Sequence, residues 1–164
     1  MPRQLWLIRH AKSSWDDLSL DDHQRPLAAR GVNAANKMAL RHLAELSQVE
    51  RCFCSTATRA KQTLALFQQQ GALPDSQYLD PLYTFDDKAL LRELQAIPDA
   101  LTEIAVLGHN PAIHELVEWL TGETIVKLPT CAVIKLECDI ASWSALSDDC
   151  AYLALFSVAR RPRS

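Results

Sequence analysis

The chain has 164 residues, 48% of them hydrophobic and 23% charged, which fits one compact domain of ordinary globular composition. Its formal charge of -3 argues against a nucleic-acid partner, because such proteins usually carry a basic excess. No apolar run approaches the ~20 residues that cross a bilayer, and the N-terminus lacks a signal-peptide pattern, so we expect a cytoplasmic protein without membrane contact.

The five cysteines are expected to be core thiols. They do not have the paired spacing of a zinc site, and their odd number does not indicate a disulfide framework. They are Cys52, Cys54, Cys131, Cys138 and Cys150.

The first motif is LWLIRHAKSS, residues 5–14, in which an apolar strand ends at Arg9 and His10. Arginine offers a planar, permanently charged fork to phosphate oxygens, and a neutral histidine nitrogen can attack phosphorus. The pair therefore predicts an anion site. The Asp-rich segment that follows, residues 12–24, reads as a loop at its rim, and Pro26 favours extended backbone at Arg25, which can then lie across the mouth of the site.

Two further segments bring similar groups to the ends of elements. Apolar spacing predicts a helix over residues 27–46, with His42 on its flank, then a strand over 51–55. Ser55 or Thr56 is expected to cap the next helix, which places Arg59 in its first turn, near the positive end of the helix dipole.

The second half repeats the alternation of strands and helices. We expect a short strand at 76–79, a helix at 87–97, a buried strand at 103–107 ending near His109, and a helix from Pro111 to Leu120 closed by Gly122. Residues 125–137 and 151–159 read as two further strands, for which antiparallel pairing near an edge of the sheet is compatible with the pattern. The tail RRPRS reads as a solvated end.

These elements predict an α/β fold: a single three-layer α/β/α domain over residues 1–164, with a mainly parallel sheet and helices on both faces. Such sheets place ligands beyond the carboxyl ends of their strands, where Arg9, His10 and His109 all fall. A metal site at His10, His109 and His114 is the sharpest alternative. It is disfavoured because His109 and His114 are five residues apart, no carboxylate completes the set, and nearby arginines repel a cation.

The motifs RHAKSSWDD, QRPLAARG, STATRAKQT and LGHNP, in this order, resemble the histidine phosphatase superfamily, the phosphoglycerate-mutase-like enzymes. Within it the chain is most similar to the small phosphohistidine phosphatases. One departure is Ala11, which stands where the family signature has glycine. The resemblance implies the phosphoglycerate-mutase-like fold and a phosphatase that needs no metal or other cofactor.

The resemblance also implies roles for the site residues. His10 would be the nucleophile and would form a covalent phosphohistidine, Arg9 and Arg59 would hold the phosphoryl oxygens, and His109 would donate a hydrogen bond to them. Substrate would be bound further by Arg25, Ser13 and the backbone N–H of Asn110. The implied partner is a protein that carries phosphohistidine, with inorganic phosphate as product. The oligomeric state stays open, and a monomer is compatible with the sequence.

The segment that in many relatives supplies a glutamic acid for the leaving group reads YLDPLYTFDD here, residues 78–87, without Glu. Asp16 and Asp22 are among the carboxylates that could serve instead. Three hypotheses therefore remain: a phosphohistidine phosphatase, a phosphatase of small esters, and a noncatalytic module that binds phosphorylated ligands. The presence of His10 argues against the third, since binding alone needs no nucleophile.

Overall fold

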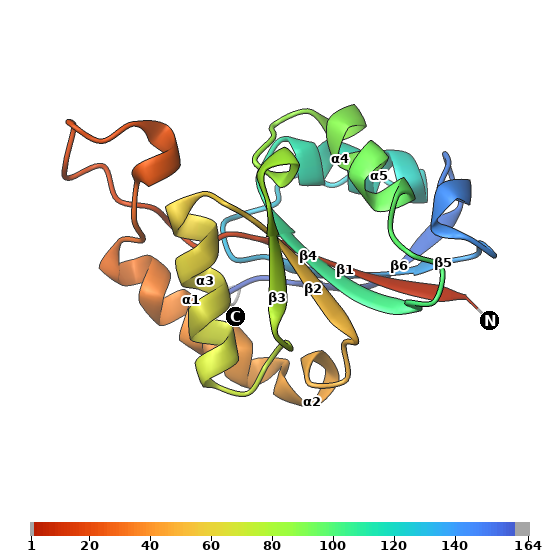
Figure 1. Ribbon diagram of the computed structural model, residues 1–164, viewed down its shortest axis with the longest axis horizontal. Coiled ribbons are helices and arrows are strands. Elements are labelled where there is room, and N and C mark those ends of the chain that lie inside the picture. The colour runs from red at the N-terminus through yellow and green to blue at the C-terminus, as the bar shows by residue number, and fades with distance from the viewer. Residues whose placement is uncertain (1, 160–164) are drawn as a thin grey trace.

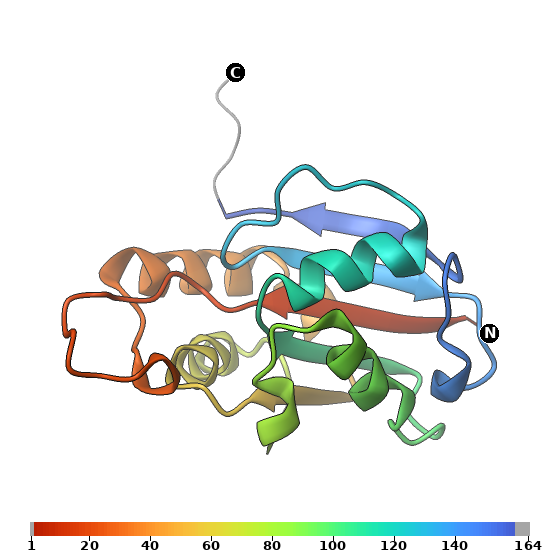
Figure 2. The same cartoon turned by 90° about the horizontal axis from the view of Figure 1, so that it is seen from above.

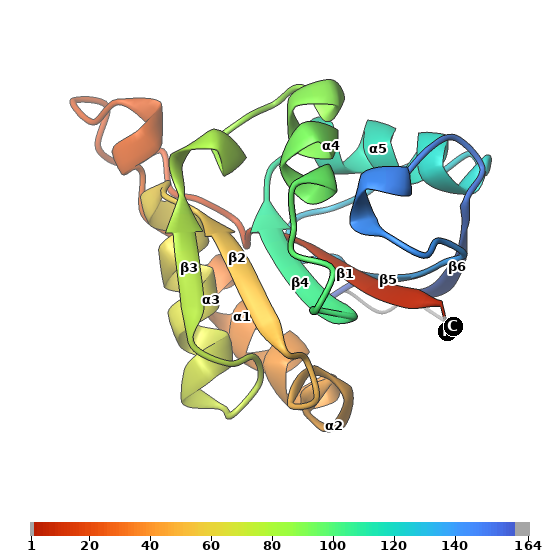
Figure 3. The ribbon, with the colours of Figure 1, turned by 45° about the vertical axis from the view of Figure 1, so that its right-hand side comes forward.

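The computed structural model describes residues 2–159 and arranges them around one six-stranded sheet, in the order β3-β2-β4-β1-β5-β6 (Figure 3). The strands are β1 (Arg3–Arg9), β2 (Arg51–Ser55), β3 (Ser76–Leu79), β4 (Glu103–Gly108), β5 (Val133–Cys138) and β6 (Ala151–Ser157). Strands β3, β2, β4 and β1 pair in parallel, whereas β5 and β6 are antiparallel additions at the β1 side. The expected mainly parallel sheet with two antiparallel strands near an edge is confirmed.

Helices cover both faces of this sheet, as predicted (Figure 1). One face carries α1 (Ala29–Arg41), α2 (Leu43–Leu46) and α3 (Thr58–Gln69), and the other carries α4 (Asp87–Gln95) and α5 (Ala112–Thr121). Short 3-10 turns lie at Asp22–Gln24, Asp80–Leu82 and Trp143–Ala145. No helix in the part of the chain that the structure describes is long and apolar enough to span a bilayer.

The central strand β1 joins the two hydrophobic cores that these layers enclose. Leu5 and Leu7 pack into the core beneath α4 and α5, whereas Trp6 and Ile8 pack into the core beneath α1 and α3. All four side chains are fully buried. A strand buried on both faces must be apolar at consecutive positions, which explains the unbroken run LWLI.

Two expected elements differ most from the sequence pattern, whereas α4 and β6 are each only two residues shorter than expected. The helix over 27–46 is broken at His42, whose buried ring bonds to the Ser157 hydroxyl of β6 at 2.8 Å, so α1 and α2 are separate. The strand expected over 125–137 begins only at Val133, because residues 125–132 form a loop whose Leu128 carbonyl is bound by side chains of the site. The tail RRPRS lies outside the described residues.

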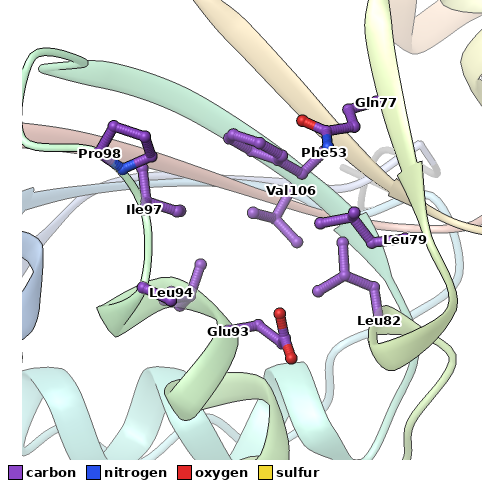
Figure 4. Close-up of a pocket in the computed structure, with 10 residues that line it drawn as sticks. Phe53, Gln77, Leu79, Leu82, Glu93, Leu94, Ile97, Pro98 and Val106 are labelled. Carbon is purple, nitrogen blue, oxygen red and sulfur yellow. The ribbon is translucent and has the colours of Figure 1, made fainter.

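The predicted site residues lie away from the apolar cavity of the fold, at the end of the sheet where the β1–α1 loop projects. An apolar cavity of about 260 Å³ lies between α4 and the middle of β2 and β4, with Gln77 and Glu93 as its polar lining, and it contains none of the predicted site residues (Figure 4). The loop between β1 and α1 projects past the carboxyl ends of the strands (Figure 2). The predicted residues gather there.

Candidate active site

The candidate site forms where β1 and β4 end side by side. Arg9 pairs with Gly108 in the parallel register, and the His10 backbone N–H donates to the Gly108 carbonyl at 3.1 Å. His10 and His109 therefore leave the sheet at the same edge, with ring centroids 5.1 Å apart. Arg59, in the first turn of α3, reaches the His10 ring from the adjoining helix.

His10 is held in one tautomer. Its Nδ1 lies 2.7 Å from the Ala11 carbonyl oxygen, which can only accept a hydrogen bond, so Nδ1 carries the proton. The lone pair is then on Nε2, where Arg59 Nε donates to it at 3.3 Å. Burial, together with the charges of Arg59, Arg9 and Arg25, lowers the pKa of His10 to about 4 against the opposing bond to Ala11. The ring is therefore neutral at pH 7, and its Nε2 lone pair can act as a nucleophile once the Arg59 N–H is displaced from it.

His109 is the more enclosed of the two rings. Its Nε2 lies 2.7 Å from the Ser55 hydroxyl, while its buried Nδ1 has no hydrogen-bond partner within residues 2–159. Tyr83 and Phe85 contact the ring edge to face, with centroids at 5.4 and 5.5 Å. Burial, together with the neighbouring His10 and Arg59, lowers the pKa of His109 to about 3, so this ring is also neutral.

Asp22 joins the two arginines that come from different segments. Its Oδ2 accepts from Arg59 Nη2 at 2.9 Å and from the Tyr83 hydroxyl at 2.6 Å, and its Oδ1 accepts from Arg25 Nε and Nη2 at 3.3 and 3.2 Å. Its backbone carbonyl accepts from Arg59 Nη1 at 2.6 Å. Burial alone would raise the pKa of Asp22, but the bonds from Tyr83, Arg59 and Arg25 outweigh it and hold the pKa at about 2. Asp22 is therefore ionised at neutral pH.

Arg25 lies within its loop instead of extending freely across a mouth. Its side chain is buried, Nη1 donates to the Ser13 hydroxyl at 2.8 Å and to the Ser14 carbonyl at 3.2 Å, and its guanidinium carbon lies 3.5 Å from the centre of the Trp15 ring. Ser13 thus positions Arg25 in this structure. The contacts of Ser13 and Arg25 with substrate stay predictions.

Arg9 and Asn110 are both tied to the loop before β5. Arg9 Nη1 and Asn110 Nδ2 each donate to the Leu128 carbonyl at 2.9 Å. Burial and the charge of Arg59 lower the pKa of Arg9, and its buried Nε has no hydrogen-bond partner within residues 2–159. Two buried nitrogens of the site, Arg9 Nε and His109 Nδ1, thus have no hydrogen-bond partner within residues 2–159. This is expected if a bound anion accepts hydrogen bonds from them.

The alternative metal set does not come together around one point. His114 Nε2 lies 2.7 Å from the Ile125 carbonyl, and its backbone N–H donates to Asn110 Oδ1. Among residues 2–159 no three His, Cys, Asp or Glu side chains are grouped to hold a metal ion. The cysteines of that range are unpaired thiols, and four of them lie in the core as predicted, whereas Cys150 is half-buried.

Several residues of the site were not predicted from the sequence. The sequence predicts Ser55 or Thr56 as the cap of α3, and this prediction is wrong, because the N-cap residue is Ala57 and no side chain caps the helix. The Ser55 hydroxyl instead accepts from the Ala57 N–H at 3.2 Å and bonds to His109. Thr63 accepts from the Ala11 N–H at 3.0 Å and donates to the Arg59 carbonyl, which connects the strand end to α3. Thr63 could have been found from the sequence, because it lies one helical turn after Arg59 and so on the same face of α3. Tyr83 gave no such signal, because its segment has no periodic pattern.

The model of the histidine phosphatase superfamily (branch 1) matches residues 5–78. An uncharacterized protein of Mycobacterium tuberculosis strain H37Rv is 34% identical over 163 residues, covering 93% of this chain and all of that protein. Phosphohistidine phosphatase SixA of Escherichia coli strain K12 is 30% identical over 140 residues, covering 83% of this chain and 86% of the enzyme.

Solved structures agree with this grouping. A structure from Nakamurella multipartitia, provisionally assigned as a phosphohistidine phosphatase SixA, superposes with a TM-score of 0.82 at 27% identity and covers 96% of each chain. The protein histidine phosphatase SixA in complex with tungstate has a TM-score of 0.80 at 24% identity, covering 95% of this chain and 97% of that one, which supports the fold.

Proposed function

Because the chain belongs to the histidine phosphatase superfamily, we propose that it is a phosphatase that hydrolyses phosphohistidine in a protein substrate, without a metal, through a covalent intermediate on His10. The proposal is carried by one arrangement of charges. His10 is neutral, with its Nε2 lone pair facing Arg59, and Asp22, the carboxylate of residues 2–159 that bonds to Arg59, is ionised. The similarity to the phosphohistidine phosphatase SixA of Escherichia coli supports the same substrate class.

In the first step, the Arg59 Nε–H would turn from Nε2 of His10 to a phosphoryl oxygen, and the freed Nε2 lone pair attacks phosphorus in line with the leaving nitrogen of the substrate histidine. The new P–N bond forms as the old one breaks, and its electron pair stays on the departing imidazole, which takes a proton from solvent. Arg9 and Arg59 would hold the equatorial oxygens. The Nδ1 proton on His10 stays bonded to the Ala11 carbonyl, which stabilises the ring as it gains positive character.

His109 would donate to a phosphoryl oxygen through Nδ1. If the Ser55 hydroxyl donates to Nε2 of His109, the single proton of the neutral ring is on Nδ1, the buried nitrogen that has no partner within residues 2–159. In the second step, water attacks phosphorus, the P–N bond to His10 breaks, and inorganic phosphate leaves with His10 neutral again.

The state of Asp22 favours this substrate class over esters. An alkoxide leaving group needs a proton from an acid, whereas the reference pKa of imidazole is only ~6.5, so a nitrogen leaving group needs little help. With a pKa of about 2, Asp22 has no proton to donate at neutral pH. Its ionisation therefore supports phosphohistidine hydrolysis and weakens the hypothesis of a small-ester phosphatase.

The test is kcat/KM for a series of leaving groups: a phosphohistidine peptide, phosphoramidate, aryl phosphates of graded phenol pKa, and a sugar phosphate. We expect a steep decline as the leaving group becomes more basic, with esters roughly 10²- to 10⁴-fold poorer. A flat series would mean that a carboxylic acid takes part, and the small-ester phosphatase would become the better assignment.

Trapping of the intermediate separates enzyme from binding module. Rapid quenching with labelled substrate should leave an acid-labile, base-stable label on His10, and His10→Ala should neither turn over nor carry it. A protein that binds substrate without label or turnover would be the noncatalytic module. The same assays after EDTA treatment should give full activity, and strict dependence on added metal would contradict the arginine-based mechanism.

A further inference from the structure

A groove of about 600 Å³ lies beside the candidate site, and we call it the basic groove. Four parts of the chain form its walls: the turn after β1, the helix α1, the loop before β5 and the segment after β6. The lining residues are Lys12, Arg30, Asn33, Ala34, Lys37, Lys127, Pro129, Thr130, Val158 and Ala159.

The charge in the basic groove is of one sign. Lys12, Arg30, Lys37 and Lys127 line it together with no carboxylate, and all four side chains are exposed. None of them forms an ion pair with a carboxylate of residues 2–159. In a chain of net charge -3, four unpaired cations on one concave surface create a local positive potential that attracts anions.

The N-terminus of α1 strengthens this potential. Arg30 lies in the first turn, where the helix dipole disfavours a cation, and that turn contains no acidic residue. The N-cap residue, Ala28, makes no side-chain cap bond. The helix end therefore adds to the positive charge of the groove and is not neutralised by a carboxylate of its own turn.

The basic groove shares a wall with the candidate site. Lys12 follows His10 by two residues, a chain length of at most ~7 Å. The Lys12 carbonyl accepts from Ala28 N–H at 2.9 Å, which joins this wall to α1, and the His10 carbonyl accepts from Cys131 N–H at 3.0 Å, directly after Thr130. These contacts set the basic groove next to the strand end that carries His10.

We propose that the basic groove binds acidic side chains that flank the phosphohistidine of a protein substrate. This rests on the proposed function and deepens it. Arg30 and Lys37 are seven residues apart on α1, about 10 Å along the helix, which matches several separate carboxylates better than one compact anion. Three of the four cations are exposed lysines, whose flexible side chains suit the electrostatic steering of a transient partner. Sites that bind small anions tightly favour the bidentate guanidinium of arginine instead.

The test compares two phosphohistidine peptides of equal length, one with Asp and Glu around the phosphohistidine and one with Asn and Gln at the same positions. In the wild-type protein, kcat/KM should be about 10-fold or more higher for the acidic peptide at low salt, mainly through KM. Lys37→Glu/Lys127→Glu should bring the ratio to one or below and leave phosphoramidate hydrolysis within about 2-fold. The control Arg51→Glu/Lys88→Glu makes the same change of net charge outside the groove and should keep the ratio.

Three outcomes would overturn the proposal: equal rates for the two peptides in wild type, equal losses on the peptides and on phosphoramidate, or an equal loss in the control pair. A binding measurement separates this from failure of the proposed function, because it needs no turnover. His10→Ala protein should bind the unphosphorylated acidic peptide more tightly than the neutral one, and the groove pair should lose that preference. Groove-dependent binding of inorganic tripolyphosphate without binding of the acidic peptide would assign the groove to a small polyanion instead.

Discussion

Replacing His10 with glutamine should make the fold less sensitive to mild acid. The native ring is neutral because burial lowers its pKa to about 4, whereas in the unfolded chain its pKa is ~6.5. As the pH falls below 6.5, the ring becomes protonated in the unfolded chain but stays neutral in the native protein. The free energy of unfolding therefore decreases until the pH reaches the native pKa. The contribution of His10 is complete above pH 6.5 and is lost between about pH 6.5 and 4.

The size of the effect follows from these pKa values. At pH 5 the ring in the unfolded chain is almost fully protonated, because this pH is ~1.5 units below its pKa. At ~1.36 kcal/mol per unit, the free energy of unfolding falls by about 2 kcal/mol. His109, with a native pKa of about 3, contributes a loss of the same sign in wild type and variant alike. Asp22 has its native pKa at about 2, below this range.

The assay is urea denaturation of wild type and His10→Gln at pH 8 and pH 5, with each protein at pH 8 as its own reference. The loss of unfolding free energy between the two pH values should be about 2 kcal/mol smaller in the variant. Losses that agree within about 0.5 kcal/mol would refute the reasoning, because they would mean that the native His10 ring accepts a proton as readily as in the unfolded chain.

Three further predictions concern the support of the site. Arg59→Lys should lower kcat/KM for phosphoramidate by roughly 30- to 1000-fold, about 2 to 4 kcal/mol, since the planar fork is lost; a change below 5-fold would contradict its role. Gly31→Ala should destabilise the fold by ~1–3 kcal/mol in thermal unfolding, although alanine favours helices, because the new Cβ would meet the Lys12 carbonyl oxygen at 2.2 Å. Thr63→Val should cost ~1–3 kcal/mol by leaving the buried Ala11 N–H without its acceptor, whereas Thr63→Ser should be close to wild type in urea denaturation; equal stabilities would contradict this.

The sequence predicted the strands and helices that carry the site because their signals are local. An apolar run buried on both faces marks β1, and the αL residue Gly122 ends α5 as expected. The meeting of His10 and His109 could be predicted as well, since the carboxyl ends of parallel strands share one edge of the sheet.

The remaining contacts depend on tertiary structure and could not be read from the sequence. The break at His42 is fixed by a hydroxyl from β6, more than a hundred residues away. Tyr83 and Phe85 reach His109 from an irregular segment whose path no periodicity specifies. Asp22 was one of several candidate acids, and only its bonds to Arg25 and Arg59 identify it as an ionised partner of the arginines.

The carboxylate of Asp22 also gives the resting site an anion of its own. Arg59 has five N–H donors, and Asp22 already occupies two of its nitrogens while His10 occupies the third. Under the proposed function, an arriving phosphoryl group would exchange with these existing hydrogen bonds, so the net gain in binding free energy would be the difference between two bound states. The same exchange would run in reverse after hydrolysis, because Asp22 can re-form its hydrogen bonds to Arg59 as inorganic phosphate leaves. In the proposed mechanism, Asp22 would thus let a site with several arginines bind a phosphoryl group and still release the phosphate product.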